Sequence, residues 1–163
     1  MTAPTTTRPV DPTVYEIPVD APRSAGPVVR VLGTLVLVAG VILGLSGAGT
    51  WAFVQSSLAD EKITVADDAA RFGGQAVNGP FTAYYEADII EKHALEASGG
   101  KTYAELDRED PVRPTVMNGS FLRASLFTSV VSFGVAAMAM GLGIVFVLIG
   151  IALRAVAKEQ ATA

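Results

Sequence analysis

The sequence predicts an all-α membrane protein: an antiparallel two-helix transmembrane hairpin with a small, mostly helical extracytoplasmic insert. Two observations predict this fold class. Neither residues 31–54 nor residues 124–153 contain an ionisable side chain. As helices these runs extend about 36 Å and about 45 Å, and the hydrocarbon core of a bilayer is about 30 Å thick. Each run can therefore cross a bilayer, and the second is long enough to tilt or to project from it.

Five segments follow from this pattern. They are a Pro/Thr-rich cytoplasmic tail (1–27), a first transmembrane helix (28–54), an acidic extracytoplasmic loop domain (55–122), a second transmembrane helix (123–153) and a short cytoplasmic tail (154–163). The prolines and the scarcity of large apolar residues predict a disordered first tail. A docking peptide for a partner is the alternative interpretation of that tail.

The first uncharged run could instead be a cleaved signal peptide, since Ser57-Leu58-Ala59 loosely fits the cleavage pattern. A signal peptide has an apolar region of about 7–15 residues, which is shorter than this run. We therefore favour a retained membrane anchor.

Basic residues flank the two runs on their terminal sides, with Arg30 before the first and Arg154 and Lys158 after the second. Basic residues near span ends prefer the cytoplasm, so both termini are predicted to be cytoplasmic in the plasma membrane. Between the runs, residues 60–113 carry twelve acidic and six basic side chains. These Lys and Arg residues oppose the orientation, whereas acids contribute little to it.

Helical signals occur within the acidic loop. Gly79-Pro80 predicts a helix start and Gly99-Gly100 a helix end. The segment from Thr102 to Glu105 fits a capping box that opens a second short helix, ended by Asp110-Pro111. A helix that begins near Thr115 is expected to run into the second span, and residues 63–65 are a weak strand candidate. So small an insert makes a marginal core alone, so we expect it to pack on the membrane, on the span ends or on a partner.

Small residues recur on one face of each run, at steps of three, four or seven. Close backbone approach at small residues is a main route to helix association in lipid, and this spacing favours a left-handed crossing of about +20°. The predicted packing residues are Gly33, Gly40, Gly44 and Gly47 in the first run and Ser132, Ala136, Ala139, Gly143 and Gly150 in the second. Leucine at Gly44 or Gly143 is expected to weaken the hairpin. The alternative is that glycine and alanine are simply common in membrane helices.

Chemistry-bearing groups are few. Ion pathways and proton relays need ionisable groups inside the membrane, so the uncharged runs argue against a pump. Trp51 fits an aromatic anchor at the outer interface. His93 is the only histidine, and with Glu96 it is a weak metal candidate at helical spacing, since a catalytic zinc usually needs three protein ligands. Cysteine is absent, which excludes disulfides and thiolate metal sites. No Gly-rich phosphate loop, GxSxG or HExxH motif occurs, so no cofactor and no catalytic set is predicted. The charge does not favour nucleic acid.

Four motifs resemble an actinobacterial family of small two-span membrane proteins: GPFTAY at 79–84, IEKHALEA at 90–97, GGKTYAELD at 99–107 and VMNGSFLRASLF at 116–127. Members of that family often carry an automatic label of aromatic ring-opening dioxygenase. That activity needs an iron site, which one histidine does not supply. The resemblance implies the two-span topology and leaves the role open.

The leading hypothesis is a non-enzymatic protein that acts through protein contacts, as an accessory or structural subunit of a larger cell-envelope membrane complex. Its expected partners are the lipid bilayer and membrane proteins of unknown identity, and a homo-oligomer is possible. The alternative is an extracytoplasmic ligand or metal sensor that uses the loop around His93.

Overall fold

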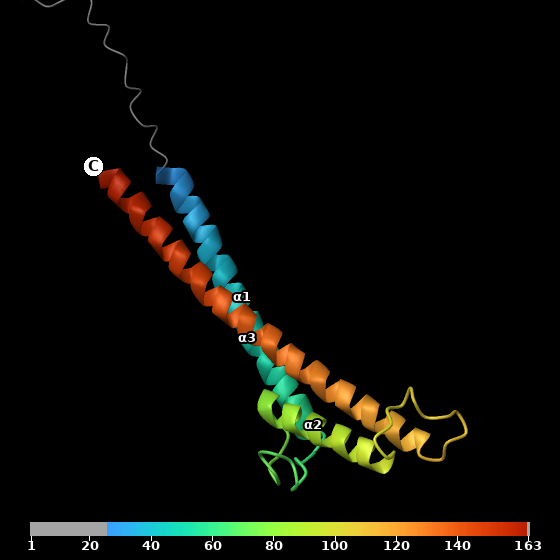
Figure 1. Ribbon diagram of the computed structural model, residues 1–163. Helices are drawn as coiled ribbons and strands as arrows, with labels where there is room; N and C mark the ends of the chain where they lie inside the picture. The colour runs from blue at the N-terminus through green and yellow to red at the C-terminus, as the bar shows by residue number, and fades with distance from the viewer. Residues whose placement is uncertain (1–25, 163) are drawn as a thin grey trace, which may run out of the picture.

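The computed structural model describes residues 26–162, and its regular elements in that range are all helices, which confirms the all-α part of the prediction (Figure 1). Its three helices are α1 (Gly26–Asp60), α2 (Pro80–Ala97) and α3 (Arg113–Thr162). Both α1 and α3 are long and apolar enough to cross a membrane. Residues 1–25 of the predicted disordered tail lie outside the described residues.

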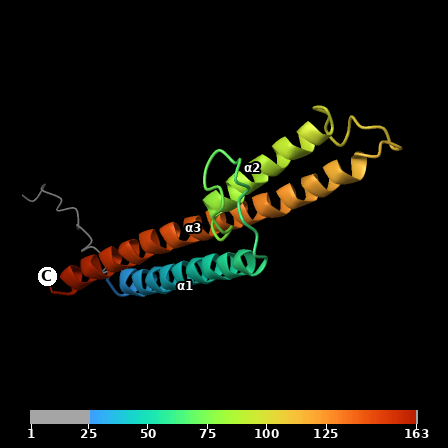
Figure 2. The ribbon, with the colours of Figure 1, turned by 90° about the horizontal axis from the view of Figure 1, so that it is seen from below.

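Helices α1 and α3 lie side by side and run in opposite directions (Figures 1 and 2). Their glycines give the register: a Cβ built on Gly33 meets Gly150, and one built on Gly47 meets Ala136. In this register about ten residues of α3, which has 50 residues against 35 in α1, extend past the C-terminal end of α1.

The same register aligns the ends of the two uncharged runs. A Cβ on Gly33 would lie 3.1 Å from Cγ of Arg154, so Arg30, one turn earlier in α1, lies near the level of Arg154. At the other end, the register places Asp60 near the level of Arg123. Charged side chains therefore bound the paired apolar segments at both ends.

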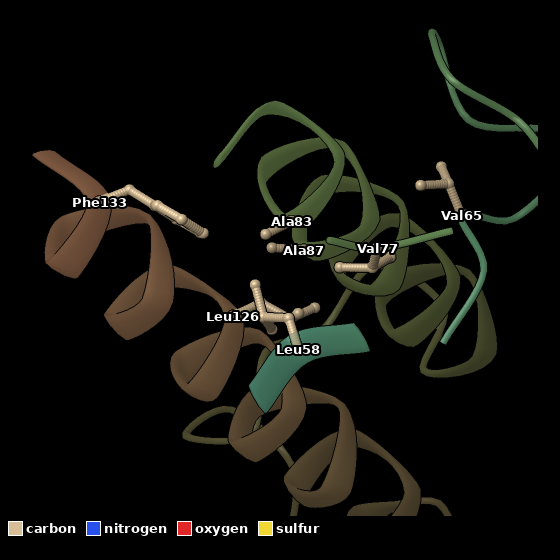
Figure 3. Close-up of a cluster of buried hydrophobic side chains, with 7 residues drawn as sticks. All are labelled: Leu58, Val65, Val77, Ala83, Ala87, Leu126 and Phe133. Carbon is tan, nitrogen blue, oxygen red and sulfur yellow. The ribbon is translucent and has the colours of Figure 1, made fainter. Parts of the chain in front are cut away.

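Helix α2 packs against the first half of α3, antiparallel to it (Figure 2). A Cβ on Gly119 would lie 3.2 Å from the Cβ of Ala94, and the rings of Tyr84 and Phe127 are 5.9 Å apart. The core lies where α2, the loop before it, the C-terminal end of α1 and the first half of α3 meet (Figure 3). It contains Leu58, Val65, Val77, Ala83, Ala87, Leu126 and Phe133. Of the three supports expected for the insert, the structure shows the ends of the long helices.

The structure confirms the predicted start and end of α2. Pro80 is its first residue, where the missing N–H costs no helical hydrogen bond. Gly99 and Gly100 follow its end with φ of 65° and 85°, and the amide of Gly100 donates to the carbonyl of Leu95 over 2.7 Å. Glycine adopts these positive φ angles without the steric cost of a Cβ.

The prediction of a second short helix between Thr102 and Asp110 is wrong, because the chain forms turns there. The capping contact itself is present: Glu105 Oε2 accepts hydrogen bonds from the backbone N and from Oγ1 of Thr102, each over 2.8 Å. The segment before Pro111 is too short to offset the cost of helix nucleation. Burial of Leu106 instead fixes its turns.

Other boundaries also differ from the prediction. Helix α1 continues to Asp60, past the predicted span end at residue 54, and α3 begins at Arg113, near the expected helix start at Thr115 and before the predicted span start at 123. Within residues 26–162 the strand candidate at 63–65 is reduced to one antiparallel bridge between Thr64 and Ala76. The amide of Val77 donates to the carbonyl of Ile63 beside it, over 2.8 Å.

Candidate functional site

A line of small residues joins α1 to α3. Gly33, Gly40 and Gly47 are buried on α1 at intervals of seven residues, and the buried Ala136, Gly143 and Gly150 repeat at the same interval on α3. A seven-residue repeat keeps one seam in contact when two helices wrap with a left-handed crossing. These six residues, here called the glycine seam, come from both predicted stripes.

Backbone atoms face each other across the glycine seam. A Cβ added at Gly40 would lie 2.7 Å from the carbonyl oxygen of Gly143 and 2.7 Å from the backbone N of Val147. A Cβ added at Gly150 would lie 2.7 Å from the carbonyl oxygen of Gly33. Because backbone atoms cannot turn aside, even a methyl group here has to separate the helices.

The other three predicted packing residues play smaller parts. Gly44 contributes only its backbone, since a Cβ on Gly143 would lie 2.7 Å from the N of Gly44 whereas a Cβ on Gly44 meets nothing within 4 Å. A methyl group at Gly44 would therefore not separate the helices, because its Cβ direction points to open space. Ser132 and Ala139 are half-buried, and the Ser132 hydroxyl donates to the carbonyl of Thr128 over 2.8 Å.

Trp51 lies against α3. Its ring centroid is 4.7 Å from that of the buried Phe133, with the planes at 64°. Edge-to-face pairs of this kind contribute about 0.5–1.5 kcal/mol beyond their buried area. This partner could not be predicted from sequence, because only the register of α1 on α3 brings the two rings together.

The metal candidates His93 and Glu96 each contact another side chain. His93 Nε2 lies 2.8 Å from Oδ2 of Asp68, whereas Glu96 lies 3.9 Å from Nζ of Lys92. The hydrogen bond from His93 lowers the pKa of Asp68 below its ordinary value. Among residues 26–162 the structure holds no group of three or more His, Cys, Asp or Glu side chains placed to bind a metal ion.

Glu86 is a buried acid that sequence reasoning missed. Its Oε2 accepts a hydrogen bond from the backbone N of Ala66 over 2.9 Å, which ties the loop before α2 to the helix. Its burial could have been predicted from the sequence. Glu86 shares one helical face with the apolar residues Ala83, Ala87 and Ile90.

A cavity of about 300 Å³ lies between the second half of α2, residues 102–104 and the start of α3. Arg123 and Glu91 line it and form an ion pair of 2.7 Å, and the guanidinium of Arg123 also lies 5.2 Å from the Phe127 ring centre. Arg123 Nε is buried without a hydrogen-bond partner in the described part of the chain. The walls include Leu95 and Val116, so the cavity joins apolar surface to one charge pair. The sequence did not predict it.

Comparison of the chain with protein-family models, with curated proteins and with solved structures finds no match. The resemblance to the two-span actinobacterial family stays a prediction.

Proposed function

We propose that the chain is a two-pass membrane protein in which α1 and α3 form a transmembrane hairpin. In this proposal both termini are cytoplasmic and the insert around α2 is extracytoplasmic. The aligned ends of the uncharged runs support it, because two helices that cross one bilayer together need their charges at matching levels. Arg30 and Arg154 lie together at the end nearer both termini, as the preference of basic residues for the cytoplasm requires.

The proposed role is that of an accessory or structural subunit that binds other membrane proteins. One observation carries this role: Phe121 and Leu122 are 65% and 53% exposed on the part of α3 that extends past α1. They precede Arg123 and so lie outside the uncharged run. Large apolar side chains grouped on a water-facing surface are typical of protein contact sites.

The glycine seam supports a structural role over a transport role. Between Gly33–Gly150 and Gly47–Ala136 the helices meet by backbone contact, so the pair is closed along its axis. Transport through the hairpin would need polar or ionisable groups along a path, and residues 31–54 and 124–153 contain no ionisable side chain.

Affinity purification in mild detergent, at native abundance, tests this role. We expect a membrane protein to co-purify with the wild-type chain and to be lost from the double variant Phe121→Ser, Leu122→Ser. Leu45→Ala is the matched control, because Leu45 is 69% exposed but lies inside the uncharged run. A wild-type chain that elutes alone, or a partner that the double variant retains, would contradict the proposal.

A ligand-binding role is the second candidate, and the cavity favours a site at Arg123 and Glu91 over the predicted one at His93. Apolar walls beside one ion pair suit a small amphiphile that carries a charged group. Native mass spectrometry of the chain released from bacterial polar-lipid nanodiscs should then show a retained molecule. Ser120→Phe, which places a ring at the cavity wall, should remove it. Retention by Ser120→Phe would exclude the cavity as its site.

A further inference from the structure

The molecule carries more uncharged helix than a bilayer needs, and the position of the insert explains the excess. We infer that the outer surface of the bilayer crosses the hairpin at Trp51 and Phe133, and that the first turn of α2 lies in the lipid headgroup layer. Phe81 and Tyr84 are the side chains that contact lipid there. This inference rests on the proposed transmembrane hairpin and adds a lipid-binding surface to it.

Helix length locates the boundary. The paired uncharged segments reach from Arg30 and Arg154 at one end to Asp60 and Arg123 at the other, a distance of about 45 Å at 1.5 Å per residue. A hydrocarbon core of about 30 Å measured from Arg30 ends near Trp51, and measured from Arg154 it ends near Phe133. These two residues are in contact, with ring centroids 4.7 Å apart.

The chemistry of α3 changes at the same level. No polar side chain occurs in residues 133–153, which extend about 31 Å. The preceding residues 124–132 contain four hydroxyl side chains, at Ser125, Thr128, Ser129 and Ser132. On α1 the contrast is smaller: Thr34, Ser46 and Thr50 precede Trp51, and Gln55, Ser56 and Ser57 follow it. The hydroxyls of Thr34 and Thr50 donate to carbonyls of their own helix, so the change in composition at this level is carried by α3.

The insert covers one face of the excess turns, while Phe53 and Val131 on other faces stay exposed. Leu58 of α1 and Leu126 of α3 are buried, and both belong to the core that includes Val65, Val77 and Ala83 (Figure 3). Phe133, which is 1% exposed, is the member of this core nearest the lipid-like segment. The insert thus begins to cover the helices at the level where the lipid-like composition ends.

This arrangement brings the start of α2 to the proposed surface. Ala83 shares the core with Phe133, and Tyr84 lies 5.9 Å from Phe127. Phe81 is 71% exposed and Tyr84 is 45% exposed, while residues 77–85 contain no Asp, Glu, His, Lys or Arg. Exposed aromatic rings without nearby charge favour the membrane–water interface, where one face is apolar and the surroundings are wet.

Depth-dependent fluorescence quenching tests the inference, because Trp51 is the only tryptophan of the chain. The full chain is reconstituted in dioleoylphosphatidylcholine vesicles that contain lipids brominated either near the headgroup or near the acyl-chain ends. We expect shallow bromines to quench Trp51 at least twofold more than deep bromines. A boundary at Asp60 and Arg123 would put Trp51 about 9–14 Å below the surface, depending on tilt. Stronger quenching by deep bromines would overturn the inference.

Reporter variants in a Trp51→Phe background test the lipid contact of α2. Phe81→Trp should be quenched by shallow bromines, whereas Phe121→Trp, on the extension of α3, should not. An unquenched Phe81→Trp would overturn the contact. Leu45→Trp separates this result from failure of the hairpin itself: it is quenched by deep bromines if the chain spans the bilayer, and its lack of quenching would overturn the proposed topology as well.

Discussion

Gly40 of α1 and Gly143 of α3 each occupy the space where the other would carry a side chain. A Cβ on Gly40 would lie 2.7 Å from the carbonyl oxygen of Gly143, and a Cβ on Gly143 would lie 2.8 Å from the carbonyl oxygen of Gly40. The closest approach of the two helices thus depends on two missing methyl groups. In lipid, where apolar side chains gain little by leaving their surroundings, such backbone contact is a main source of helix association.

Gly40→Ala should destabilise the helix pair by about 1–3 kcal/mol, the usual cost of inserting a methyl group into a packed site. The measurement is unfolding of the purified chain by SDS titration, followed by circular dichroism. Gly44→Ala is the matched control from the same helix, because its Cβ would meet nothing within 4 Å. Equal losses from the two variants would contradict the register described for α1 and α3.

Phe133→Ala should cost about 3–5 kcal/mol, as is typical for the removal of a buried aromatic ring. The variant loses the contact with Trp51 at 4.7 Å and opens the core between α3 and α2. Thermal unfolding in detergent should show a lowered midpoint and a red-shifted Trp51 emission. Phe53→Ala, which alters a ring that is 71% exposed, is the control and should leave both nearly unchanged.

Glu86→Ala should loosen the loop that precedes α2. The substitution leaves the amide of Ala66 without its carboxylate partner, and an unsatisfied buried donor costs about 1–3 kcal/mol. Hydrogen exchange should show faster exchange at residues 63–77. Asp88→Ala removes an exposed acid from the same helix and should leave exchange at 63–77 at the wild-type rate; comparable acceleration in both variants would count against the buried bond.

Acid should open two exposed contacts in the insert. The hydrogen bond from His93 lowers the pKa of Asp68, and the hydrogen bond from the backbone N of Thr102 lowers the pKa of Glu105. A carboxyl group with a lowered pKa in the folded state stabilises that state above its unfolded pKa, and the contribution is lost as the pH falls through the folded value. The contacts should hold at pH 5 and above and weaken below about pH 4.

Solution NMR of the detergent-solubilised chain can follow this titration at the Thr102 amide. We expect the amide shift to move with a midpoint below that of a free glutamate, and Glu105→Gln to abolish the movement. A midpoint at the ordinary glutamate value would show that the Thr102–Glu105 contact does not form in solution.

The long helices could be predicted from sequence because their signal is local. Uncharged runs flanked by Arg30 and Arg154 predict apolar helices whatever else the chain does. All six residues of the glycine seam were predictable for the same reason, since residues at intervals of seven, such as Gly33, Gly40 and Gly47, share a helix face. The sequence could not distinguish Gly44 from these three glycines, because a shared helix face does not show which Cβ points at the partner helix.

The insert was harder to predict, because its contacts join residues distant in sequence. Asp68 pairs with His93 only after the loop before α2 folds back onto that helix, and Arg123 meets Glu91 only through the packing of α2 on α3. The predicted helix after Thr102 failed for the opposite reason. A correct local cap at Glu105 was present, but tertiary burial of Leu106 decided the backbone.

Labelling of single cysteines in this cysteine-free chain measures the topology most directly. Ser98→Cys, in the turn after α2, should react with a membrane-impermeant maleimide added to intact cells. Ser24→Cys and Ala163→Cys should react only after the membrane is permeabilised. Reaction of Ser24→Cys and Ala163→Cys from opposite sides of the membrane, or of all three cysteines in intact cells, would contradict the two-pass hairpin.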